Sequence, residues 1–305
     1  MARGGTYMNI NLIGVPLFYG SDIEGVEFGP KKLREKNVVE VLSKYHKVYD
    51  FGDLYVPEEN SVNKYSYHPK MKYLKPIIQV NTNLAQEVYS SLSSKSFPLI
   101  LGGDHSLALG SISGVSKYYK NFAVIWVDAH GDINSYLTTL TGNVHGMPLA
   151  AAMGVGYEDL TNLYFHGTKV KPENVFIIGA RDLDEGECEL IEEKKLNVYS
   201  TEDIKYKGIF NIMEDILSKL NAQGIDAVHL SFDIDCIDSD FVPGTGTPVK
   251  DGLSTGEAKT LLKHLGESRL IKSMDFVELN PKLDKDDSTS DLCIELLDWC
   301  FKYIK

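Results

Sequence analysis

Apolar runs rich in β-branched residues recur along the chain and alternate with segments of helical periodicity. Runs of this kind without a polar face are typical of strands covered by helices on both sides. Alternation of strand and helix predicts a parallel sheet with right-handed crossovers. The predicted strands are 8–13, 47–51, 97–101, 122–127, 174–178, 227–232 and 270–277. The predicted helices are 30–43, 77–92, 107–118, 187–195, 209–220, 254–265 and 288–303.

Local signals support these helix predictions. Pro30 and Pro76 each fall in a predicted first turn, where proline lacks an N–H that would be unpaired anyway. Ser254 and Glu257 have the spacing of a capping box. No linker or low-complexity stretch divides the chain. We therefore predict one three-layer α/β/α domain over residues 8–305, with residues 1–7 as a natural leader or a cloning remnant.

Composition and charge narrow the possible functions. The chain has 305 residues, of which 43% are hydrophobic and 24% are charged, as is typical of a globular protein. Its apolar runs are too short to span a bilayer, and the first residues lack the pattern of a signal peptide. A cytoplasmic protein without membrane contacts is therefore expected. The net charge of −12 disfavours nucleic-acid partners and would attract a cationic small substrate.

The four cysteines suggest no metal or disulfide framework. They are Cys188, Cys236, Cys293 and Cys300, and no two of them form a Cys-x-x-Cys pair. We predict reduced, buried thiols, as is usual for free cysteines in a cytosolic protein.

Acidic and imidazole side chains directly follow four of the predicted strands. Because ligands of an open parallel sheet bind beyond the carboxyl ends of its strands, such side chains should gather at one edge. The residues at or just beyond these four ends are His105, Asp128, Asp233 and Glu278.

Two of these positions begin alternating motifs, Asp-x-His-x-Asp at 128–132 and Asp-x-Asp at 233–235. Side chains at i and i+2 point the same way as long as the chain stays extended. Four carboxylates and two imidazoles exceed the ligand set of one catalytic zinc but suit two divalent ions that share carboxylates. An oxygen-rich set of this kind favours Mn²⁺ over zinc or copper. The predicted ligands are His105, Asp128, His130, Asp132, Asp233 and Asp235.

These motifs resemble those of the ureohydrolase superfamily over nearly the whole chain. Segments 102–106, 128–132 and 231–235 are similar to its three metal signatures. Segments 132–134, 141–148, 180–187 and 278–284 look like the arginase family rather than the agmatinases. The resemblance implies a central, mainly parallel, eight-stranded sheet and two Mn²⁺ ions per subunit. It also implies hydrolysis of L-arginine to L-ornithine and urea.

The resemblance implies roles for individual metal ligands. The ligands of the first ion, or of both ions, would be His105, Asp128, Asp132 and Asp235. His130 and Asp233 would complete the second set, and the expected bridging carboxylates are Asp128, Asp132 and Asp233.

Further residues match positions that hold the substrate in the family. The α-carboxylate contacts would be Asn134, Thr139 and Thr141. The α-amino contact would be Asp184, with Asp182 beside it. Glu278 would pair with the guanidinium, and Thr247 would lie near that group.

We hypothesise that a hydroxide bridging the two metal ions attacks the guanidinium carbon. Glu278 would hold the cation in a two-pronged, charge-assisted pair. Asp132 would pass the hydroxide's proton to the departing amine. His145, which matches the family's proton-shuttling histidine, would exchange protons with solvent.

Alternatives differ in what they require of these residues. An agmatinase, or another guanidino-acid ureohydrolase, would need no α-amino contact, so Asp184 would have no substrate group to bind. A deacetylase of related fold would use one zinc, whereas this chain has ligands for two ions. A non-catalytic binding or scaffold protein would be expected to lack a ligand, and none is replaced. The resemblance also implies a homo-oligomer, a trimer or hexamer, although Gly256 stands where relatives often carry an interface arginine.

Overall fold

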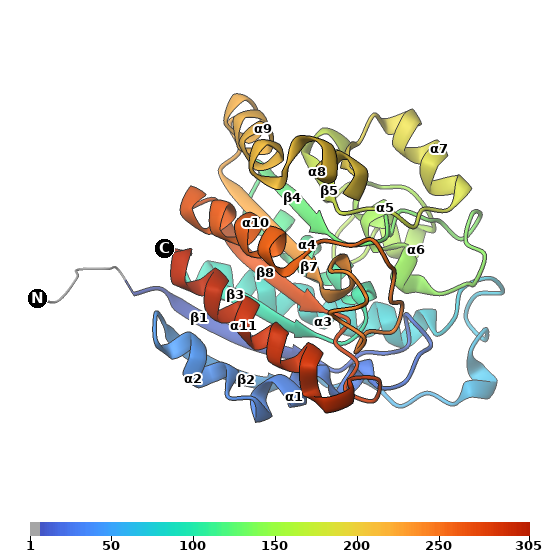
Figure 1. The fold of residues 1–305 in the computed structure, drawn as a ribbon. Coiled ribbons are helices and arrows are strands. Elements are labelled where there is room, and N and C mark those ends of the chain that lie inside the picture. The colour runs from blue at the N-terminus through green and yellow to red at the C-terminus, as the bar shows by residue number, and fades with distance from the viewer. Residues whose placement is uncertain (1–6) are drawn as a thin grey trace, which may run out of the picture.

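The computed structural model describes residues 7–305, in which eight parallel strands form one sheet (Figure 1). The spatial order is β2-β1-β3-β8-β7-β4-β5-β6, and every neighbouring pair is parallel. The α/β fold and the eight-stranded sheet expected from the sequence are therefore confirmed. The strands are β1 (Asn9–Val15), β2 (Lys47–Asp53), β3 (Phe97–Gly102), β4 (Phe122–Val127), β5 (Val175–Ile178), β6 (Asn197–Tyr199), β7 (Ala227–Asp233) and β8 (Ile271–Val277).

Helices cover both faces of this sheet. Apolar side chains of α1, α2, α9, α10 and α11 join one core cluster, and those of α3, α4 and α5 join the other. Successive residues of a central strand alternate between the two clusters: Ile125 belongs to the first and Trp126 to the second. The helices are α1 (Gly29–Glu35), α2 (Val38–Ser43), α3 (Leu74–Ser93), α4 (Ala108–Tyr118), α5 (Pro148–Ala152), α6 (Glu158–Thr161), α7 (Glu185–Lys194), α8 (Thr201–Lys207), α9 (Ile209–Ala222), α10 (Thr255–Ser268) and α11 (Ser288–Tyr303).

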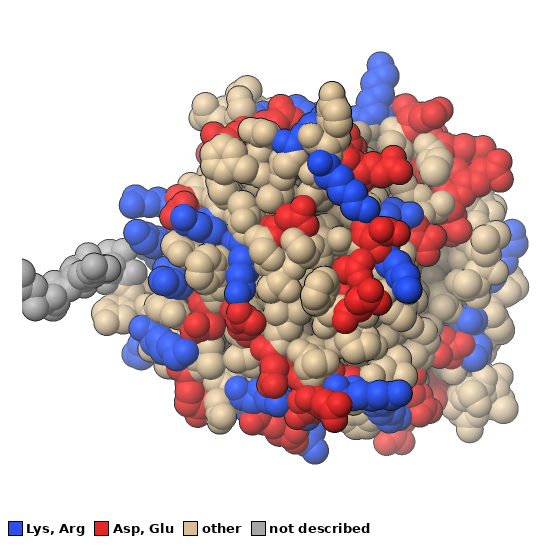
Figure 2. All heavy atoms as spheres, in the orientation of Figure 1, with Lys and Arg blue, Asp and Glu red and all other residues tan. Residues whose placement is uncertain are grey.

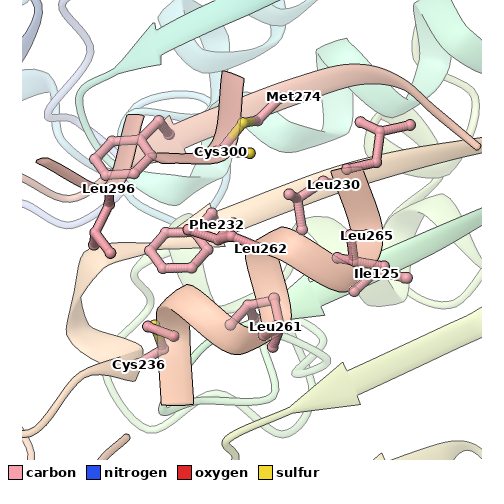
Figure 3. Packing of buried hydrophobic residues seen from close by; sticks show 14 of the residues in the cluster. Ile125, Leu230, Phe232, Cys236, Leu261, Leu262, Leu265, Met274, Leu296 and Cys300 are labelled. Atoms are coloured by element: carbon pink, nitrogen blue, oxygen red, sulfur yellow. The ribbon is translucent and has the colours of Figure 1, made fainter. Parts of the chain in front are cut away.

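The core holds the strands that carry the site. Leu261 and Leu262 of α10 lie toward Phe232 of β7 (Figure 3), and Phe232 stacks on Phe276 of β8 with 5.3 Å between ring centroids. All four side chains are at most 1% exposed. Burial of one such side chain contributes about 1.5–3 kcal/mol. The ends of β7 and β8 are thus anchored by packing before any ligand is considered.

Several predicted elements differ from the observed ones. The predicted helix 30–43 breaks into α1 and α2, because Asn37 adopts a left-handed conformation with φ of 61°. The edge strand β6 was not predicted, since three residues are too few to show a period. The short helices α5, α6 and α8 were missed for the same reason. The capping box of Ser254 and Glu257 is confirmed at the start of α10.

The predicted leader falls mostly on residues 1–6, outside the described part of the chain, and Tyr7 is exposed. All four cysteines are unpaired, and three are buried, but Cys188 is exposed, so the prediction of buried thiols was wrong there. It lies in α7, whose outer face is solvated. Within residues 7–305, no helix has the length and apolar character needed to cross a membrane.

Figure 2 shows both signs of charge interspersed on one face of the molecule, with acidic side chains gathered at the upper right over α7. The exposed glutamates of that helix are Glu185, Glu189, Glu192 and Glu193. This arrangement agrees with the acidic net charge of −12.

Candidate metal centre and substrate cavity

Four neighbouring strands, β3, β8, β7 and β4, end at the same edge of the sheet and deliver all the predicted ligands. Asp233 is the last residue of β7, and Asp128 directly follows β4. His105 begins a 3-10 helix three residues beyond the end of β3. The strand order is not the chain order, since β8 lies between β3 and β7. Residues far apart in sequence therefore meet.

The first group of ligand atoms surrounds His105 Nδ1. This nitrogen lies 3.0 Å from Asp128 Oδ2, 3.2 Å from Asp233 Oδ2 and 3.3 Å from Asp132 Oδ2. The His105 side chain is 1% exposed, and Nδ1 has no hydrogen-bond partner among the described residues. A buried nitrogen without a partner that faces three carboxylate oxygens has the surroundings of a metal ligand.

The second group surrounds His130 Nδ1, which lies 3.3 Å from Asp128 Oδ1 and 3.2 Å from Asp235 Oδ2. Asp128 thus offers one oxygen to each group. The ligand atoms of His105, Asp128 and Asp132 lie within 4.8 Å of one another, and so do those of His130, Asp128 and Asp235. We call these sets the His105 group and the His130 group. The grouping differs from the expectation for Asp235, which lies with His130. Asp233, an expected bridging carboxylate, lies with His105. The chain is not extended here, because residues Ile234–Cys236 form a 3-10 helix that turns Asp235 aside.

The electrostatics of the two groups favour cations. Burial and repulsion between neighbouring carboxylates raise the pKa of Asp233 and raise the pKa of Asp132 to about 6. At Asp128, contacts with both imidazoles outweigh burial and hold its pKa below the usual range. Carboxylates buried this close together repel one another when all of them are ionised. Divalent cations between them would remove that repulsion. The donor set therefore fits two metal ions.

Behind the His105 group lies a buried polar network. His105 Nε2 is 2.8 Å from Ser231 Oγ, which donates to Asp275 Oδ2 at 3.3 Å, and His229 Nε2 lies 3.0 Å from the same oxygen. Ser231 donates its hydroxyl proton to Asp275, so it accepts from the Nε2–H of His105. That tautomer leaves Nδ1 with a free lone pair. His229 is thus a fully buried, hydrogen-bonded member of the network behind the site.

Replacing Ser231 with alanine is expected to weaken Mn²⁺ binding by about 10–100-fold, because the His105 imidazole loses the acceptor that fixes its tautomer. Calorimetric titration of metal-free protein measures this affinity. The matched control is Ser113→Ala, since Ser113 is also fully buried but bonds only to Leu109 of its own helix. Equal Mn²⁺ affinities of the two variants would contradict the role of Ser231.

Glu278 lies next to the His105 group and is 1% exposed. Its Oε1 accepts a hydrogen bond from the backbone N–H of His105 at 2.8 Å and lies 3.3 Å from His145 Nδ1. Its Oε2 is buried and has no partner among residues 7–305. Burial alone would lower the pKa of His145, but the Glu278 carboxylate outweighs it and raises that pKa to about 9. One carboxylate oxygen is thus left for a cationic ligand.

A cavity of ≈ 180 Å³ adjoins the centre. Its walls include His130, Asp132 and His145 together with all six polar residues predicted for the α-amino and α-carboxylate contacts or for the neighbourhood of the guanidinium. Those six are Asn134, Thr139, Thr141, Asp182, Asp184 and Thr247. Thr247 also donates to Asp235 Oδ2 at 3.0 Å, which joins the cavity wall to the His130 group.

Three lining residues, Asn143, Gly146 and Glu187, were not predicted. Glu187 is buried and accepts hydrogen bonds from the N–H groups of Ile133 and Asp184. Burial raises the pKa of Glu187 to about 7. The signal for Glu187 was present in the motif 180–187, but a glutamate in the first turn of a helix is ordinarily read as a capping residue.

Backbone strain marks two of the site residues. Asp132 has φ of 51° and Glu278 has φ of 67°, although neither is glycine. Such conformations cost about 1–3 kcal/mol each and persist where the surroundings enforce them, often at functional sites.

Comparison with known proteins agrees with this geometry. The model of the arginase family matches residues 8–301. The arginase of Bacillus subtilis (strain 168) is 42% identical over 290 residues, covering 95% of this chain and 96% of the relative. The solved native structure of Bacillus caldovelox arginase is similar with a TM-score of 0.91 and 38% identity, covering 96% of this chain and 98% of that one. The structure of Entamoeba histolytica arginase in complex with L-ornithine is similar with a TM-score of 0.90 and 32% identity, covering 98% and 99%.

Proposed function

The chain belongs to the arginase family, and we propose that it hydrolyses L-arginine to L-ornithine and urea with a pair of Mn²⁺ ions. The observation that carries the proposal is the shared carboxylate of Asp128. It links two histidine-centred ligand groups beside a cavity lined by small polar residues. A scaffold protein of the same fold would have no need to retain all six ligands together.

The residues that would hold the first ion are His105, Asp128, Asp132 and Asp233. Those that would hold the second are His130, Asp128 and Asp235. When bound, such a pair lowers the pKa of water and so supplies a nucleophile near neutral pH. Five of the six ligand side chains are almost fully buried, and only His130 is partly exposed, on the cavity side.

The remaining chemistry belongs to side chains of this chain. Glu278 holds the guanidinium through a charge-assisted hydrogen bond to Oε2, the carboxylate oxygen that has no partner among residues 7–305. Asp132, which lines the cavity, accepts a proton and returns it to the departing amine. His145, 17% exposed at its side chain, lies between Glu278 and the cavity and exchanges protons with solvent.

The amino-acid end of the substrate is held at the cavity rim. Asp184 accepts from the side-chain amide of Asn134 at 2.8 Å and has capacity for an α-amino group. Thr139 and Thr141 accept from the backbone N–H groups of Gly142 and Asn143, so their hydroxyl protons are free to donate to an α-carboxylate. Asp182 is more exposed and lies beside Asp184. The Entamoeba histolytica relative crystallised with L-ornithine is similar over 98% of this chain, which supports an amino-acid ligand.

A direct test measures urea release from metal-stripped protein that is re-supplied with Mn²⁺, Co²⁺, Fe²⁺ or Zn²⁺. We expect L-arginine to be turned over in preference to agmatine, which lacks the α-carboxylate, and Mn²⁺ to restore the most activity. Preference for agmatine would assign the protein to another ureohydrolase activity. Absence of urea from both substrates with every ion would refute the proposal.

Removal of the metal ions by a chelator is expected to lower the melting temperature by roughly 5 °C or more. Ligands that bind only the folded state at 100 times their Kd contribute about 2.7 kcal/mol, and unneutralised carboxylates add repulsion. Differential scanning calorimetry with and without chelator measures the shift, and excess Mn²⁺ should reverse it. Excess Mg²⁺, a poorer ion for imidazole ligands, serves as the control.

We further propose a cytoplasmic homo-oligomer, a trimer or hexamer. The unpaired cysteines agree with a reducing compartment. Light scattering of the purified chain tests the assembly.

A further inference from the structure

Arg181 lies in the loop between β5 and α7 and donates only to backbone carbonyl oxygens. Its Nε donates to Lys250 at 2.9 Å, and Nη1 donates to Gly179 at 3.2 Å and Cys236 at 3.1 Å. Its Nη2 donates to Asp235 at 2.8 Å, Val249 at 2.9 Å and Ile237 at 3.3 Å. No carboxylate within residues 7–305 pairs with this guanidinium. Its hydrogen-bonding capacity is thus used on the main chain.

The acceptors are concentrated in one loop. Asp235, Cys236 and Ile237 are consecutive, and Val249 and Lys250 lie where the same loop returns before α10. Arg181 thus closes both ends of the loop that carries Asp235 and Thr247. Gly252 supports the arrangement, because a Cβ at that position would lie 2.7 Å from Arg181 Nη2.

The backbone of Arg181 is tied to a second part of the site. Its N–H donates to the carbonyl oxygen of Ala129 at 2.8 Å, and Ala129 lies between Asp128 and His130. In turn the N–H of Ala129 donates to Asp235 Oδ1 at 3.2 Å. Arg181 therefore fixes the separation between the segment that carries His130 and the segment that carries Asp235.

The His105 group lacks this support. Its ligands are Asp233, at the end of the buried strand β7, and His105, whose ring stacks on Trp126 at 3.9 Å between centroids. Asp132 also belongs to it. Neither the backbone nor the side chain of these residues bonds to Arg181 in the described structure. The two groups are held by different means. The sheet core and its polar network hold the His105 group, whereas the His130 group depends on the loop whose two ends are joined by the Arg181 guanidinium.

We propose that Arg181 is a positioning residue that fixes the distance between His130 and Asp235 in the His130 group. Removal of Arg181 would therefore weaken the binding of one metal ion and leave the binding of the other unchanged. The inference rests on the proposed binuclear centre. A lysine can fill this role only in part, since one ammonium offers three donors from a single point, whereas the planar guanidinium reaches six carbonyl oxygens.

The test counts Mn²⁺ bound per chain by equilibrium dialysis with elemental analysis, over a range of free Mn²⁺. We expect two ions of similar occupancy in the unaltered protein. In Arg181→Met one ion should be retained with unchanged affinity, while the affinity for the other falls about 10–100-fold. Electron paramagnetic resonance should show the signal of a coupled pair replaced by that of isolated Mn²⁺ at low loading.

Two further variants make the outcome decisive. Arg34→Met removes an arginine that pairs with Asp50 and Asp53 far from the centre, and it should keep two ions. Arg181→Lys should show an intermediate loss of one ion, and it replaces the methionine variant if that one does not fold. Equal weakening of both ions, or no weakening in either Arg181 variant, would overturn the inference. Failure of the unaltered protein to bind two ions would overturn the proposed centre, and the inference with it.

Discussion

Replacing Asp128 with alanine is expected to abolish binding of both metal ions and to lower urea production by about 10³-fold or more. The residue offers Oδ2 to the His105 group and Oδ1 to the His130 group, so one substitution removes a ligand from each. Metal-assisted activation of water supplies several kcal/mol of transition-state stabilisation, and each 1.36 kcal/mol is a tenfold change in rate. Elemental analysis and a urea assay on the same sample measure both losses.

The matched control is Asp226→Ala, which removes an exposed carboxylate just before β7 and should leave metal content and rate unchanged. An Asp128→Ala protein that keeps two ions and full activity would refute the assignment of the shared ligand. Loss of activity with both ions retained would show that Asp128 acts in another way.

Replacing Glu278 with glutamine is expected to lower kcat/KM for L-arginine by about 10²–10³-fold and to leave the metal content unchanged. A buried, hydrogen-bonded charge pair costs about 2–5 kcal/mol when one partner is removed. The amide oxygen of glutamine can still accept from the N–H of His105, so the backbone contact survives. Only the negative charge next to the guanidinium is lost.

Steady-state kinetics with L-arginine, together with metal analysis, tests this expectation. Binding of Mn²⁺ serves as the internal control, because Glu278 belongs to neither ligand group. A variant with wild-type kcat/KM would exclude Glu278 from guanidinium binding. A variant that lost its metal ions would instead assign Glu278 to the centre itself.

The location of the site could be predicted from sequence because parallel strands present their carboxyl ends at one edge. Asp128 and Asp233 follow apolar runs directly, so their place was readable without the order of the strands. Which strands are neighbours could not be predicted, since β8 lies between β3 and β7 although it comes last along the chain. The eight-stranded sheet was expected only through family resemblance, because β6 is too short to show a pattern.

The pairing of ligands was less predictable than their identity. Alternation assumes an extended chain, and the 3-10 helix after Asp233 breaks that assumption. The role of Arg181 could not be anticipated at all, because its partners are carbonyl oxygens that every residue carries. A side chain that bonds only to backbone groups has no partner of a particular residue type, so the sequence gives no sign of the contact.

The stacking of Trp126 on His105 has a practical consequence. The indole lies parallel to the imidazole at 3.9 Å and donates to Asp128 Oδ2 at 2.9 Å, while the protein's other tryptophan, Trp299, lies in α11. Occupancy of the neighbouring ligands by a paramagnetic ion would quench the emission of this indole and leave that of Trp299 as a reference. The protein thus contains its own fluorescent reporter, and loading can be followed in real time without a label.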